Sequence, residues 1–259
     1  MLTKSIFSSI ALCILCTTGF AQTASFKNLQ STSAEGKRTF RFPIVELENP
    51  TTAANINSEL AEEVINRLFE TNMPLVRTME LPDAIAELAK NACSSGKCSI
   101  TGLDYKVLYN KNGLLSLKFT FENVQNPLWE KDFYFNFDLK TGAYLKIKDI
   151  VEPTQMPALM AHFYQNVALR NDIAAAKILN HDNFKADAAA QKRINDCLEK
   201  VAKPILRDFA FTENGLTLVT DYQSFVDILQ AKPKDDFLYD YKFVRFFLNP
   251  TIVQSLHVS

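Results

Sequence analysis

The sequence predicts an α+β fold, with antiparallel meander sheets and helices packed on one face. Two observations favour it: strand-like segments occur in runs rather than alternating with helices, and two of these runs contain Asn-Gly turns. Runs of strands separated from runs of helices favour α+β over a parallel α/β sheet. Apolar residues make up 47% of the 259 residues, which suffices for one substantial core or two small ones.

The first 21 residues have the features of a secretory signal peptide. One lysine is their only charge, an apolar stretch runs from Ile6 to Leu15, and small residues at Gly19 and Ala21 suit cleavage before Gln22. We therefore expect a periplasmic or secreted chain with no transmembrane helix, because no apolar run approaches the length that spans a bilayer. An uncleaved anchor and a lipid on Cys16 are the alternatives.

Export to an oxidising compartment favours disulfide formation. Cys93 and Cys98 are separated by four residues, and we expect them to form a disulfide across this short ring. A redox or metal-binding pair is the alternative, although no His is close in sequence. Cys197 shares a helical stripe with Ile194 and Leu198, which predicts a buried free thiol.

The elements before residue 105 are expected to be a strand and two helices. Residues 22–38 are polar and lack periodicity, which predicts a flexible leader. A strand over 39–45 follows, and Pro43 suggests an edge position for it. A helix then begins with Thr51 or Thr52 as its cap, and a second helix runs from Pro82 to the cysteine ring. The buried stripe of the first helix is Ile56, Leu60, Val64 and Leu68.

The middle of the chain predicts an antiparallel meander with one apolar face. Asn112-Gly113 is a strong hairpin signal, and apolar residues alternate on both sides of it. The expected strands cover 105–109, 115–121 and 133–139. An antiparallel sheet can leave its polar face in water, so helices need to cover only the apolar face.

The rest of the chain predicts helices, a second hairpin and a last strand. Helical periodicity covers 153–206, and Asn214-Gly215 marks the hairpin turn. The aromatic run 238–248 indicates a strand, and a short helix begins at Pro250. We expect an N-terminal half over 39–150 and a C-terminal half over 151–259, joined in one compact unit.

The polar face of the meander is the candidate binding face. It carries Tyr134, Asn136 and Asp138 on one strand, and a Tyr between hydrogen-bonding groups suits a protein or sugar surface. We expect Tyr134→Ala to weaken binding with little effect on folding, because this side chain points away from the apolar row. The alternative is an ordinary solvated sheet face.

Other chemistry has little support in the sequence. The chain has 28 Lys and Arg against 29 Asp and Glu, so it has no basic excess for nucleic acid. Its three His are isolated, and it has no Gly-x-Ser-x-Gly elbow and no glycine-rich nucleotide loop. We expect no catalytic residue, no cofactor and no metal ion.

A glycan hydrolase stays open as the alternative function. Asp132 and Asp138 share a strand face, but six residues at about 3.3 Å each separate them by roughly 20 Å. A glycosidase pair needs less than about 10 Å. A carboxylate from another strand would be required.

The order of elements over roughly residues 39–256 resembles a bacterial extracytoplasmic domain pair of unknown function. That pair occurs in the ectodomain of the lysozyme-sensing anti-sigma factor and ahead of peptidoglycan N-deacetylase domains. The segments that carry the resemblance are Phe42–Val45, Ile56–Leu60, Tyr105–Val107, Gly113–Leu117, Phe137–Gly142, Leu145–Ile150 and Phe211–Leu216. The resemblance implies a non-enzymatic binding domain for an envelope component or an extracellular protein. A lysozyme-like hydrolase and a peptidoglycan fragment are the partners it implies.

Overall fold

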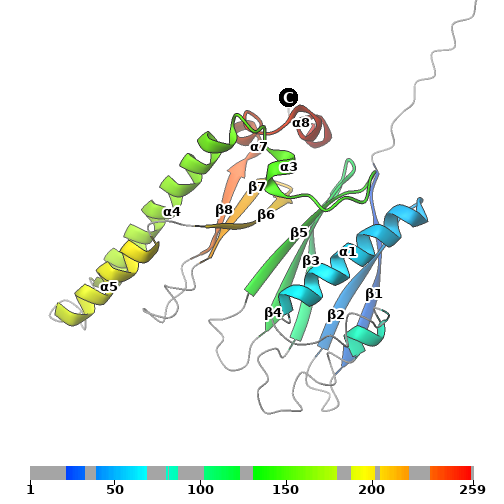
Figure 1. Ribbon diagram of the computed structural model, residues 1–259, viewed down its shortest axis with the longest axis horizontal. Helices are drawn as coiled ribbons and strands as arrows, with labels where there is room; N and C mark the ends of the chain where they lie inside the picture. Colours follow the sequence, from blue (N-terminus) through cyan, green and yellow to red (C-terminus); the bar gives the residue numbers. More distant parts are fainter. Residues whose placement is uncertain are drawn as a thin grey trace, which may run out of the picture.

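The computed structural model has the expected α+β class (Figure 1). It describes residues 22–32, 39–68, 80, 82–86, 102–122, 131–179, 188–201, 205–221 and 234–257. Within these residues it contains a five-stranded, mostly antiparallel sheet and a three-stranded antiparallel sheet. The prediction of the fold class is therefore confirmed.

The first sheet has the strand order β1-β2-β3-β4-β5. Its strands are β1 (Ser25–Thr32), β2 (Thr39–Glu46), β3 (Gly102–Lys111), β4 (Leu114–Glu122) and β5 (Lys131–Asp138). Only the β2–β3 pairing is parallel. Asn112 and Gly113 have φ angles of 57° and 81°, so they form the predicted tight turn between β3 and β4.

The flexible leader expected over 22–38 is wrong for its described part. Ser25–Thr32 forms β1, which pairs with β2 along its whole length. Phe26 and Leu29 pack against the core and supply the apolar contacts of this otherwise polar strand.

Since β1 covers one side of β2, Pro43 lies in an inner strand and not at an edge. The pairing of β2 with β3 is limited to Phe40 and Leu103. The ladder between these strands therefore needs no N–H donor at position 43, where proline has none.

Helix α1 (Pro50–Leu68) covers the apolar face of the first sheet (Figure 1). Its predicted stripe is correct in the described side chains, because Ile56, Leu60 and Val64 are fully buried. The cap is Asn49 and not a threonine: its Oδ1 accepts the N–H groups of Thr51 and Thr52 at 3.0 and 3.2 Å.

The second sheet has the order β6-β7-β8. Its strands are β6 (Leu206–Thr212), β7 (Gly215–Thr220) and β8 (Asp236–Asp240). The later helices are α3 (Ile147–Ile150), α4 (Met156–Leu179), α5 (Ala188–Val201), α7 (Tyr241–Val244) and α8 (Pro250–Leu256). The strand predicted over 238–248 is wrong beyond Asp240, whose side chain accepts the N–H of Lys242 at 2.6 Å and starts α7.

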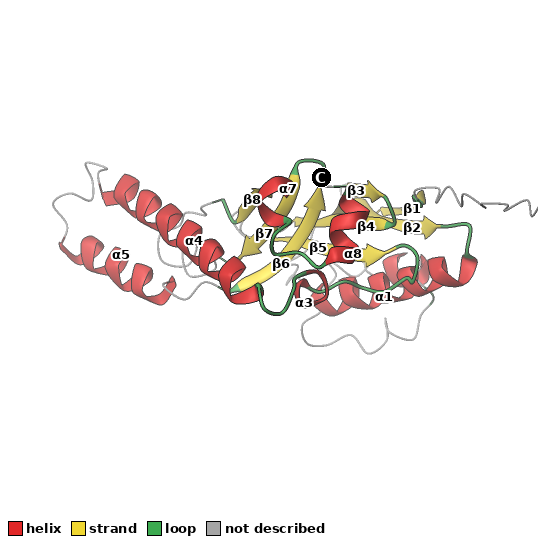
Figure 2. Ribbon diagram, turned by 90° about the horizontal axis from the view of Figure 1, so that it is seen from above, coloured by secondary structure: helices red, strands yellow, loops and turns green. Residues whose placement is uncertain are grey.

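Strand β6 packs on the face of the first sheet opposite α1. Figure 2 shows that β6 runs obliquely to the strands of the first sheet. Ala210 and Val219 of the second sheet pack on Tyr134 and Leu108 of the first. The other face of the second sheet packs on α4, α7 and α8 through a second core that includes Phe163, Phe211 and Ile252. The part of the polar face that carries Ser116, Tyr134 and Asn136 is therefore an interface between two sheets.

Several expectations concern residues that the structure does not describe. The first 21 residues, Cys93 and Cys98 lie outside the described residues, as does the side chain of Cys197. The signal peptide, the disulfide and the division near residue 150 stay predictions. In the part of the chain that is described, no helix has both the length and the apolar character needed to cross a membrane.

Candidate functional site

The expectation that Tyr134 and Asn136 face water is wrong. Tyr134 is 6% exposed and Asn136 is 1% exposed, because β6 covers this part of β5. Asp138 is half-buried at the end of the strand, where its Oδ1 accepts the N–H groups of Lys140 and Thr141 at 2.7 and 3.1 Å. The burial of Tyr134 removes the basis for the small effect of Tyr134→Ala on folding, and we expect this change to lower the stability, since it removes a packed side chain.

A buried chain of hydrogen bonds joins the two sheets through Asn136. The Asn136 Nδ2 group donates to the carbonyl of Phe209 at 2.7 Å. The Ser116 hydroxyl donates to Asn136 Oδ1 and accepts the N–H of Phe211 at 2.9 Å. Ser116 and Asn136 are paired across β4 and β5, so one cross-strand pair satisfies two main-chain groups of β6.

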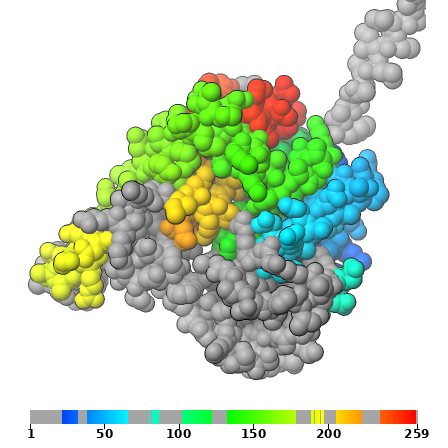
Figure 3. Space-filling view, viewed as in Figure 1, coloured from blue at the N-terminus to red at the C-terminus, as the bar shows by residue number. Residues whose placement is uncertain are grey.

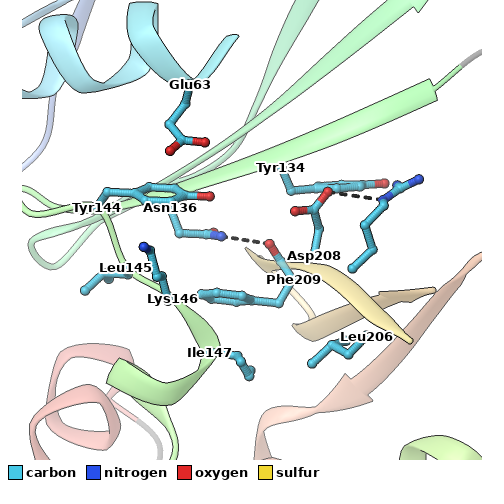
Figure 4. A pocket seen from close by; sticks show the side chains of 11 residues that line it. Glu63, Tyr134, Asn136, Tyr144, Leu145, Lys146, Ile147, Leu206, Asp208 and Phe209 are labelled. Carbon is cyan, nitrogen blue, oxygen red and sulfur yellow. Dashed lines mark hydrogen bonds and ion pairs between the residues drawn. The ribbon is translucent and has the colours of Figure 1, made fainter. Parts of the chain in front are cut away.

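A pocket of about 320 Å³ lies where β5, β6 and α1 meet (Figure 4). Its volume is at the lower end of the range for small-molecule sites. Tyr134 and Asn136 line it, so two residues of the predicted binding face do reach a common cavity, whereas Asp138 does not. The other lining residues are Glu63, Tyr144, Leu145, Lys146, Ile147, Leu206, Arg207, Asp208 and Phe209.

A β-bulge brings an ion pair to this pocket. Leu206 pairs with Thr220 and Asp208 pairs with Val219, which leaves Arg207 as an extra residue in β6. A bulge changes the direction of neighbouring side chains, and here Arg207 Nε lies 3.3 Å from Asp208 Oδ2. The Asp208 side chain is 4% exposed, so the pair is held largely away from water.

The Arg207 guanidinium is fixed by further contacts with β5. Its Nη2 donates to the carbonyl of Asp132 at 2.7 Å, and its centre lies 5.7 Å from the ring of Phe133. Asp132 is itself held by Lys118 Nζ at 2.9 Å and by the Thr120 hydroxyl at 2.7 Å. The charges on this side of the pocket are therefore fixed in position before any ligand arrives.

A second, more open pocket of about 490 Å³ adjoins the first along α1. Tyr144 and Lys146 line both pockets. Asn55, Ser58 and Glu59 of α1 line the second pocket, opposite residues 141–143. Figure 3 shows the surface of α1, in cyan, next to the green surface that contains the segment after β5. The two pockets give a mostly polar surface beside this helix.

Burial, reinforced by the carboxylates of Asp132, Asp235 and Asp236, raises the pKa of Tyr134 well above its ordinary value of 10.0. Tyr134 ionises in the unfolded chain first, so the free energy of unfolding should fall as the pH rises above about 10. We expect Tyr134→Phe to make this fall shallower by up to about 1.4 kcal/mol per pH unit, a limit that is approached only above pH 10. Urea denaturation between pH 9 and about 11 measures the slope, and an unchanged slope in the variant would contradict the burial of this hydroxyl.

One of the three sequence-isolated His, His162, packs among aromatic rings. His162 lies on α4, and its ring contacts those of Phe243 and Phe247 edge-on, at centroid distances of 5.3 and 6.0 Å. Within the described ranges, no three residues among His, Cys, Asp and Glu are placed to hold a metal ion.

Sequence reasoning missed most of the pocket. Glu63, Tyr144, Lys146, Arg207 and Asp208 come from segments far apart in the chain. Lys146 falls in the segment Leu145–Ile150 that carries the resemblance, but no motif marks any of the five as a pocket residue, and the bulge at Arg207 leaves no signal in the sequence.

Two solved structures resemble this chain over most of its length. One is a DUF3298 family member from Bacteroides fragilis, with 12% identity and a TM-score of 0.48, covering 92% of this chain and 97% of that chain. The other is a DUF3298 family protein from Pseudomonas aeruginosa, with 16% identity and a TM-score of 0.49, covering 89% and 94%. At these values the likeness carries no argument about a ligand. No family model and no curated protein matches the sequence.

Proposed function

We propose that this chain is a non-enzymatic binding module of an extracytoplasmic compartment, and that the pocket beside β5 receives part of an envelope component. The observation that carries the proposal is the meeting of Tyr134 and Asn136 with the Arg207–Asp208 ion pair in one pocket. The features of the first 21 residues support the compartment.

The chemistry of the lining favours a peptidoglycan fragment as the ligand. Arg207 and Lys146 offer cations for carboxylates, whereas Glu63 and Asp208 offer acceptors for amines and hydroxyl groups. Tyr144 presents an aromatic ring between the two pockets, where a sugar can pack. The other implied partner, a lysozyme-like protein, is too large to enter a pocket of about 320 Å³ and would contact only its rim.

Lys146→Ala should weaken the binding of muropeptides at least about fivefold, because this exposed lysine lines both pockets. Titration calorimetry with purified disaccharide-peptide fragments measures the change. Lys148→Ala is the matched control. Lys148 is two residues from Lys146 and is also exposed, but it lines neither pocket. Equal losses in the two variants, or no binding by the unchanged protein, would contradict the proposal.

A glycan hydrolase is the second candidate, because Glu63 and Asp208 place two carboxylates in the same pocket. Incubation with peptidoglycan and assay of new reducing ends distinguishes the two functions. The binding proposal predicts no release above the blank. Release that disappears in Glu63→Gln would replace it with the hydrolase.

A further inference from the structure

Strand β5 is an edge strand of the first sheet, and two of its residues line the pocket. The main-chain groups of successive residues in a strand face opposite neighbours. The Leu145 N–H donates to the carbonyl of Asn136 at 2.7 Å, and the Asp138 N–H donates to the carbonyl of Ala143 at 3.0 Å. The even-numbered residues of β5 therefore direct their main-chain groups away from β4, toward the open edge.

Within the described ranges, only part of this edge has hydrogen-bond partners. At the C-terminal end of β5, the segment 143–145 forms hydrogen bonds with Asn136 and Asp138. At the other end, Arg207 Nη2 donates to the carbonyl of Asp132 at 2.7 Å. Between these two contacts lie the N–H and carbonyl of Tyr134 and the N–H of Asn136. Among the described residues, none of these three groups has a hydrogen-bond partner.

The residues that carry these groups belong to the pocket and not to an open surface. Tyr134 and Asn136 both line the pocket, and both are almost fully buried. Main-chain donors and acceptors at such burial are nearly always paired in proteins, with other protein groups, a ligand or ordered water. A ligand that supplies matching main-chain groups would displace water from this edge and complete the pairing.

We propose that the pocket binds an extended peptide segment, which adds to the first sheet as a strand beside β5. One residue of a parallel strand can donate its N–H to the carbonyl of Tyr134 and accept the N–H of Asn136, and the carbonyl two residues before it can accept the N–H of Tyr134. Its side chain then lies on the α1 side, toward Glu63 and Tyr144, and its neighbours' side chains lie toward Asp208. The inference rests on the proposed function, because it uses the same pocket and names the class of ligand.

The probe is a random heptapeptide library displayed on phage and selected on the immobilised full chain. Selected peptides are synthesised again with each amide N-methylated in turn, since methylation removes the donor and blocks close approach of a strand. We expect affinity to fall at least about tenfold at the one amide that donates to the Tyr134 carbonyl and to change little at the two amides next to it, because those face away from β5. The Tyr134 and Asn136 amide signals of the labelled protein should shift in the same titration.

A pair of variants tests the protein side. Tyr134→Ala and Tyr134→Pro both remove the side chain, but only proline also removes the outward N–H. That N–H takes no part in the β4–β5 ladder, so the proline leaves this ladder intact. With both variants shown to be folded by circular dichroism, we expect weaker peptide binding by Tyr134→Pro than by Tyr134→Ala.

The outcomes separate this inference from the proposed function. A flat N-methylation profile, or selected peptides that leave the Tyr134 and Asn136 signals unmoved, overturns strand addition. If muropeptides still bind in a Lys146-dependent manner in that case, the binding module stands and only the ligand class is wrong. If neither muropeptides nor peptides bind, both proposals fail.

Discussion

Replacing Asn136 with alanine should lower the free energy of unfolding by about 3 kcal/mol. The change leaves the Phe209 carbonyl and the Ser116 hydroxyl without their recorded partner in a buried interface. Each buried polar group that loses its partner costs about 1–3 kcal/mol. Chemical denaturation followed by circular dichroism measures the loss.

Asn195→Ala is the control for Asn136→Ala, because Asn195 is exposed on α5. We expect its effect to stay within about 0.5 kcal/mol. The double variant Ser116→Ala/Asn136→Ala should lose less than the sum of the single variants, since the two side chains belong to one network. Additive losses, or a loss no larger than that of Asn195→Ala, would contradict the role given to Asn136.

Arg170→Ala should lower the free energy of unfolding by about 2–3 kcal/mol through loss of the contact between α4 and β8. The Arg170 guanidinium lies 3.6 Å from the ring centroid of Phe237 and donates to the carbonyls of Lys234 and Asp236. Hydrogen bonds from a charged donor contribute about 1.5–3 kcal/mol, and a cation–π contact about 1 kcal/mol.

Arg170→Lys should recover only part of this loss, because an ammonium group lacks the planar fork that reaches both carbonyls. Lys177→Ala on the same helix is the control, since Lys177 is exposed, and it should change stability by less than about 0.5 kcal/mol. Full rescue by lysine would show that charge alone is what Arg170 contributes.

The sequence predicted the turns and helix faces that depend only on neighbouring residues. The turn at Asn112-Gly113 needs positive φ at both residues, and the structure has it there. The stripe of α1 follows from helical spacing alone, as Ile56 and Leu60 show. Strand β1 was missed because most of its residues are polar, and only Phe26 and Leu29 pack against the core. Its pairing with β2 is a contact between segments, which the composition of β1 does not predict.

The binding face was misplaced because polar side chains at a sheet surface suit either water or another sheet. Asn136 and Ser116 bond to the main chain of β6, which begins about seventy residues further along the chain. Alternation in β5 tells which side chains share a face, and it does so correctly for Tyr134 and Asn136. What covers that face depends on the tertiary packing of β6, which local alternation does not specify.

The chemical-shift changes of the labelled full chain on titration with muropeptides test the central claim most directly. Binding in the pocket at the sheet junction predicts that the largest changes fall on Tyr144, Lys146 and Asp208, and that Lys146→Ala reduces them. Changes confined to the exposed aromatic side chains Phe243 and Phe246, which are 37% and 67% exposed on the far side of the second sheet, would contradict the account.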